Sequence, residues 1–153
     1  MTRSQIPLRL RRLIITRARQ CCEYCLLHQD DAPDTHQIDH IIALRHKGKT
    51  RSANLACACA ECNRYKGTDF GTIDPQTGKV IFLFNPRSQK WRDHFALEGA
   101  RIVSLTLTGE VTIELLHLNS DARLLEREML MAEGHCAFAL VTSFVHSSGA
   151  VRR

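Results

Sequence analysis

The stretch that decides the fold begins with Cys22-Glu23-Tyr24-Cys25 and closes, after 33 intervening residues, with Cys59-Ala60-Glu61-Cys62. A gap of two residues lets one turn of backbone point two sulfurs at the same ion, as a tetrahedral structural zinc site requires. Two such pairs in one short segment are a specific indication. We therefore expect a structural zinc ion bound by Cys22, Cys25, Cys59 and Cys62.

Three further cysteines leave the choice of ligands open. Cys21 could replace Cys22, and Cys57 lies two residues before Cys59. The equal spacing of the two pairs favours the first set, and Cys136 is expected to be buried. Seven cysteines without a secretory signal make a disulfide framework a poor explanation, so metal ligation is the better one.

The charge of the chain is concentrated in the half that carries these cysteines. Residues 1–70 hold 12 Lys or Arg against 7 Asp or Glu, whereas residues 71–153 hold 9 of each. Six arginines fall within the first 20 residues. A basic surface beside a metal site favours a polyanionic partner such as nucleic acid, although arginines on a helix can also be a merely solvated face.

The first half is predicted to form a basic helix, a β-hairpin and a second helix. Pro7 and the helical spacing of apolar residues predict a helix over 7–20 with arginines outward. Residues 28–35 read as a loop, 37–44 as a strand, 45–52 as a polar turn, and 54–57 as the returning strand. A helix from Ala60 would end at Gly67, which suits a C-terminal cap.

The second half is predicted to be a small α+β extension packed with the first half in the same domain, giving regions 1–70 and 71–153. We expect a turn at 74–78, a strand at 80–84, a hairpin of 102–107 with 111–115 about Gly109, and a helix from Asn119 or Ser120 to Glu133. Trp91, His94 and Phe95 are expected in the core. The most apolar late segment, 136–145, is too short to span a bilayer.

Asp39 and His40 are neighbours on the first predicted strand, so their side chains should point to opposite faces. Asn54 follows His40 after thirteen residues, and Asn63 follows Asn54 after eight. This order, bracketed by the cysteine pairs, resembles the HNH endonucleases, the ββα-metal nucleases, in their zinc-bound form. The resemblance covers about residues 17–67. A weaker likeness to a bacterial subgroup extends over Leu83–Arg87 and Trp91–Phe95.

The resemblance implies a role for each matching residue. Asp39 and Asn63 would bind a catalytic divalent cation, Mg²⁺ or Mn²⁺. His40 would be the general base that activates water, and Asn54 would brace the loop that orients it. Arg64 or Lys66 could contact phosphate, with Arg11 and Arg12 of the first helix on the DNA backbone. In-line hydrolysis in this family leaves a 5′-phosphate and a 3′-hydroxyl.

Two positions depart from the family pattern. Ala43 stands where a proline is common, and Lys47-Gly48 stands where two glycines are frequent. His36, four residues before His40, is expected to be a surface histidine, with metal ligation as its alternative.

The sequence as a whole predicts an α+β protein, a ββα-metal unit with a four-cysteine zinc site, that hydrolyses DNA in the cytoplasm. A start rich in arginine is also compatible with an organelle transit peptide. The rivals are a zinc-dependent nucleic-acid-binding module without catalysis, an RNA nuclease, and a rubredoxin-like iron protein.

Overall fold

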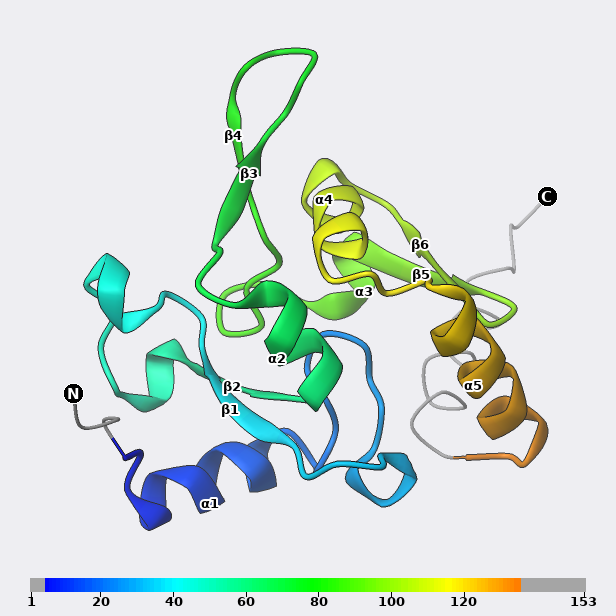
Figure 1. The fold of residues 1–153 in the computed structure, drawn as a ribbon, viewed down its shortest axis with the longest axis horizontal. Coiled ribbons are helices and arrows are strands. Elements are labelled where there is room, and N and C mark those ends of the chain that lie inside the picture. Colours follow the sequence, from blue (N-terminus) through cyan, green and yellow to red (C-terminus); the bar gives the residue numbers. More distant parts are fainter. Residues whose placement is uncertain (1–4, 136–153) are drawn as a thin grey trace, which may run out of the picture.

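The computed structural model describes residues 5–135, so the expectation for Cys136 lies outside the described residues. Figure 1 shows two groups of elements, with α1, β1, β2 and α2 in one and α3, β5, β6, α4 and α5 in the other. The β3–β4 hairpin projects from between them. Each of the three sheets in the described residues is a pair of antiparallel strands.

Helix α1 (Leu8–Arg17) begins after Pro7 and covers one side of the β1–β2 hairpin. Its buried Ile14 packs with Leu55 and Cys57 of the hairpin. The helix ends three residues before the predicted end because Arg19 and Gln20 both have positive φ, which a right-handed helix excludes. The predicted basic helix is otherwise confirmed.

Strands β1 (Gln37–His40) and β2 (Leu55–Ala58) pair from Gln37↔Ala58 to His40↔Leu55, and α2 (Ala60–Lys66) packs against them. The hairpin followed by a helix is as predicted. The first strand ends at His40, four residues before its predicted end. It ends there because the backbone amide and carbonyl of Ile42 bond to the side chain of Asn54 and not to a neighbouring strand. Gly67 follows α2 with φ +52°, as expected of a C-terminal cap.

The predicted hairpin of 102–107 with 111–115 is wrong. Strand β6 (Arg101–Ser104) pairs instead with β5 (Phe95–Glu98), and Leu107–Leu115 is helix α4. Thr106 caps α4 by accepting a hydrogen bond from the Gly109 amide. Gly109 is required because a Cβ there would overlap the carbonyl of His94. The alternation of β-branched residues here is therefore overridden by the cap and by close packing.

The remaining elements of the second half are β3 (Gly71–Ile73), β4 (Val80–Phe82), α3 (Trp91–His94) and α5 (Asp121–Ala132). Of these, α5 and β4 match predicted elements, with β4 ending two residues early, whereas β3 and α3 were not predicted. Phe95 is buried and Trp91 packs against the core. That core joins residues of the first cysteine pair to Leu83, Phe84 and Leu116 of the second half. None of the helices within 5–135 has the length and apolar character that crossing a membrane demands.

Candidate zinc centre and hydrolytic site

The four predicted zinc ligands come together in one buried cluster. The sulfurs of Cys22, Cys25, Cys59 and Cys62 all lie within 4.8 Å of one another. The Cys25 and Cys59 sulfurs are 3.7 Å apart. A tetrahedron with zinc–sulfur bonds of about 2.3 Å has edges of about 3.8 Å, so the donor set fits zinc in both chemistry and size.

Backbone amides support the thiolates. The amide of Cys25 donates to Cys22 Sγ at 3.5 Å, and the amide of Cys62 donates to Cys59 Sγ at 3.4 Å. Cys59 is also the N-cap of α2, where the helix dipole favours a negative charge. Each two-residue gap thus forms a turn whose own amide stabilises the first sulfur.

The alternative ligands lie outside this cluster. Cys57 is buried against Ile14 of α1, and burial raises the pKa of its thiol to about 12. The backbone of Cys21 pairs with that of His28 in an isolated antiparallel β-bridge, and the residue is partly exposed. The structure therefore places Cys22, and neither Cys21 nor Cys57, in the four-sulfur cluster.

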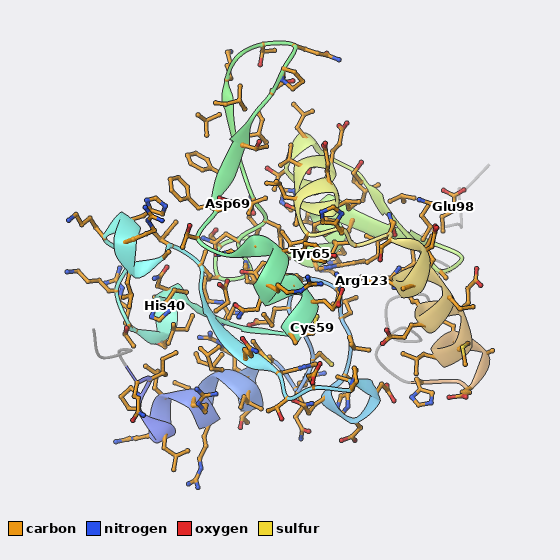
Figure 2. The ribbon with its side chains drawn as sticks, in the orientation of Figure 1. His40, Cys59, Tyr65, Asp69, Glu98 and Arg123 are labelled. Carbon is orange, nitrogen blue, oxygen red and sulfur yellow. The ribbon has the colours of Figure 1, made fainter. Side chains whose placement is uncertain are left out.

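Arg123 of α5 adds a cationic partner to the cluster that the cysteine spacing does not reveal. Its guanidinium lies 3.1 Å from Cys62 Sγ and 3.8 Å from Cys59 Sγ, and it also donates to the carbonyl of Leu116. Figure 2 shows Arg123 directed from α5 toward the segment that carries Cys59. Since four thiolates on Zn²⁺ carry a net charge of −2, a buried arginine offsets part of it.

His40 lies at the opposite end of the hairpin from Cys59, as the strand register requires and Figure 2 shows. Its ring is partly exposed, and Nε2 is 2.9 Å from Thr50 Oγ1. Burial lowers the pKa of His40, with Asp39 opposing the shift and Lys66 adding to it. The imidazole is therefore neutral near pH 7 and able to accept a proton.

Asn54 holds the loop that runs between the two strands. Its side chain accepts from the Ile42 amide and donates to the carbonyls of Ile42 and Lys49. Gly48 is needed because a Cβ there would overlap the Ile42 carbonyl. Lys47, where the family often has glycine, takes a left-handed conformation at φ +70°. Ala43 has φ −61°, which is also the value of a proline.

Asp39 points into the protein, on the face opposite to His40. The residue is 4% exposed; its Oδ2 accepts from the Tyr24 hydroxyl at 2.7 Å, and Oδ1 lies 3.2 Å from Lys66 Nζ. Burial raises the pKa of Asp39, and both partners oppose that rise. Burial also raises the pKa of Tyr24 well above its usual value, so the phenol remains a donor.

The expected contact of Lys66 with phosphate is contradicted by its position. The residue is 2% exposed, and its ammonium also donates to the backbone carbonyls of His40 and Ile41. Lys66 therefore ties the end of α2 to the end of β1. Helix α2 in this way connects the cysteine cluster at its start to the His40 segment at its end.

The expected ligands of the divalent cation, Asp39 and Asn63, fit the role only in part. A carboxylate and an amide oxygen are suitable donors for Mg²⁺. The Asn63 amide nitrogen bonds to Gln37, which does not involve the oxygen that would bind a cation, whereas the Asp39 carboxylate is already bonded to Lys66 and Tyr24. In this arrangement a cation at Asp39 competes with the ammonium of Lys66.

The remaining basic residues are placed at the surface. Arg12 is exposed and Arg11 partly so on α1, while Arg64 pairs with Glu61 at 3.3 Å and stacks on Tyr65. Arg17 donates to the carbonyls of Ser52 and Leu55, which fixes α1 to the hairpin.

The basic loop, residues 45–51, was missed as a candidate interface. It carries four cations at the surface: Arg45, Lys47, Lys49 and Arg51. No Asp or Glu occurs between Ile41 and Ala60, which was the available signal. Thr50, the partner of the His40 ring, also belongs to this loop. The loop therefore supplies both a partner of the His40 ring and four exposed cations.

His36 is not the surface residue that the sequence suggested. Its ring is buried, and Nε2 is 2.8 Å from the carbonyl of Leu27. It is not among the residues of the four-sulfur cluster. Its role within the described structure is to fix the segment that leads into β1.

Comparison with known proteins agrees with this geometry. Residues 22–69 match the family model of the HNH endonucleases. No curated protein and no solved structure matches the chain. The matched segment contains both cysteine pairs, the hairpin and α2, and its similarity to this family suggests nuclease activity on nucleic acid.

Proposed function

We propose that this HNH unit hydrolyses phosphodiester bonds of DNA, with His40 as the general base. The observation that carries the proposal is the neutral, partly exposed imidazole of His40, which lies at the end of β1 and contacts Thr50 of the basic loop. A neutral base at the surface and a cationic rim are what hydrolysis of a phosphodiester needs.

The contact of Thr50 with Nε2 of His40 supports Nδ1 as the nitrogen that serves as the base. When Nε2–H donates to Thr50 Oγ1, the lone pair lies on Nδ1, and this nitrogen accepts the proton of the attacking water. Lys66 bonds to the carbonyl of His40 and Asn54 to the amide of Ile42, so both hold the backbone that follows the ring. General-base catalysis of this kind contributes typically about 10²- to 10⁴-fold to the rate.

The basic loop supplies the electrostatic attraction for the DNA backbone. Lys47 and Lys49 flank Gly48, close in sequence to the Thr50 that holds His40. Arg11, Arg12 and Arg64 are additional proposed contacts. Contacts to phosphate carry little sequence information, so we expect weak sequence specificity.

The proposal includes a divalent cation, Mg²⁺ or Mn²⁺, with Asp39 and Asn63 as its ligands. When bound, such an ion stabilises the negative charge of the leaving oxygen and polarises the phosphate. Competition with Lys66 gives this assignment a specific consequence. Lys66→Met should bind Mn²⁺ more tightly than the wild type in a titration of the zinc-loaded protein. An unchanged affinity would remove Asp39 from the ligand set.

The test of the function is cleavage of supercoiled plasmid by zinc-loaded protein with Mg²⁺, with Mn²⁺, or with no added divalent cation. We expect relaxed or linear DNA with 5′-phosphate ends only when the cation is present. An equimolar RNA substrate in the same assay separates a DNA nuclease from an RNA nuclease. Well-folded, zinc-loaded protein that binds plasmid and never cuts it would favour the non-catalytic binding module.

A further inference from the structure

The β3–β4 hairpin exposes one apolar face. We define this apolar face as Ile73, Val80 and Phe82. Ile73 and Val80 are cross-strand partners, and Phe82 lies on the same side opposite Gly71. Their exposed fractions are 56%, 53% and 61%. The other face, with Ile81, packs against the core. A two-stranded ribbon gains little stability from an uncovered apolar face, so this face is suited to a ligand.

Aromatic contacts connect the apolar face to the basic loop. The ring of Phe82 stacks on that of Phe70, with centroids 6.2 Å apart and planes inclined by 23°. The edge of His46, in the basic loop, meets the ring of Phe70 at 5.1 Å. Figure 1 shows the hairpin rising between the loop after β1 on one side and α4 on the other. These ring contacts link His46 of the basic loop, through Phe70, to Phe82 of the apolar face.

This combination favours nucleic acid over a second copy of the chain. The core of a protein–protein interface is depleted of charge, whereas here the apolar face borders a loop with four cations and no acid. Cations that hold phosphates beside aromatic rings that stack on bases are the usual parts of a single-strand binding surface. Phenylalanine and isoleucine side chains also wedge between base steps in distorted duplexes.

We propose that the apolar face binds unstacked bases of the DNA whose backbone lies on the basic loop, with Phe82 as the stacking platform. This rests on the proposed function and narrows its substrate to DNA with unpaired or distorted bases, such as single strands, gaps and branches. The extension thereby contributes part of the substrate site.

The test is DNA binding by the full chain in the His40→Ala background, without added divalent cation. The probes are a 2-aminopurine oligonucleotide as a single strand and the same strand in a duplex. We expect the protein to bind the single strand more tightly than the duplex and to quench the 2-aminopurine fluorescence of the single strand. Phe82→Ala should weaken that binding by about 5- to 150-fold, corresponding to about 1–3 kcal/mol per stacked base, and abolish the quenching. Phe82→Trp should restore both.

Matched controls separate stacking from charge. Leu125→Ala removes an equally exposed apolar side chain from α5 and should leave binding unchanged. Lys47→Ala with Lys49→Ala should lower the slope of log affinity against log salt by about 1 for each phosphate that the variant no longer neutralises. Phe82→Ala should keep that slope, because it removes no charge.

Wild-type affinity and quenching in Phe82→Ala would overturn the proposal. So would concentration-dependent dimerisation that Phe82→Ala abolishes while DNA affinity stays the same. The two proposals fail separately. If the wild type cleaves plasmid but Phe82→Ala binds the single strand normally, only the stacking site is contradicted. If Phe82→Ala loses binding but the wild type does not cleave plasmid, only the nuclease activity is contradicted.

Discussion

At the scale of single residues, the decisive feature is the buried ion pair between Asp39 and Lys66. Lysine and aspartate are rarely buried unless they are paired with an opposite charge, and here the two side chains form an ion pair with each other. The Lys66 ammonium also satisfies two carbonyls at the end of β1. The pair therefore fixes the backbone of His40 while the ring of His40 faces the other way.

Removing one partner of this pair should destabilise the fold strongly. Lys66→Met leaves the Asp39 carboxylate buried and unpaired, so we expect a loss of about 3–5 kcal/mol in the free energy of unfolding. Asp39→Asn combined with Lys66→Met should recover part of that loss. Chemical denaturation of the zinc-loaded variants measures both, and strictly additive losses would show that the two residues do not interact.

At the scale of elements, α5 has a direct link to the cysteine cluster through Arg123, which is 8% exposed. Arg127, one turn later, is a natural comparison because it is also buried but donates only to carbonyls, those of Ala100 and Leu118. Comparing variants of the two arginines therefore distinguishes a contact with the cysteine sulfurs from contacts with backbone carbonyls alone.

Arg123→Met should accelerate zinc release to a coloured chelator. Residues that bond to metal ligands typically contribute about 10- to 100-fold in metal affinity, and we expect a change of that size. Arg127→Met should lower thermal stability without a comparable effect on zinc release. Equal zinc release from both variants would mean that α5 acts on the cluster only through general stability.

At the scale of the whole molecule, the cysteine cluster joins the two halves. Glu23, inside the first pair, bonds to the Cys57 amide and to Arg87, and the Trp91 indole donates to the carbonyl of Tyr24. These bonds attach the segment after β4 to the first cysteine turn. Folding of both halves is therefore expected to depend on the metal.

Removal of zinc should unfold the chain cooperatively. Structural zinc contributes apparent binding free energies of about 10–16 kcal/mol to folding in small domains. Trp91 fluorescence reports on the second half, and circular dichroism reports on all helices. Both signals should change together as a chelator removes zinc. An unchanged Trp91 signal in zinc-free protein would show that the second half folds independently.

The sequence predicted the parts of the site whose chemistry is local. Spacing predicted which four cysteines come together in the cluster, and the order of Asp39, His40 and Asn54 predicted the hairpin. Burial of Lys66 and His36 was not predictable, because it depends on where α2 and the 28–35 segment pack. Arg123 lies 61 residues from Cys62, and no local pattern connects them. Helix α4 was missed because its apolar residues alternate as in a strand.

The most direct test of the central claim is the nicking rate of zinc-loaded His40→Ala on supercoiled plasmid with Mn²⁺. His28→Ala is the control, since His28 is a partly exposed histidine that caps a 3-10 turn outside the hairpin. The account predicts that His40→Ala loses about 10²- to 10⁴-fold in rate at unchanged zinc content and DNA affinity, while His28→Ala nicks like the wild type. Equal nicking by His40→Ala and wild type would contradict it.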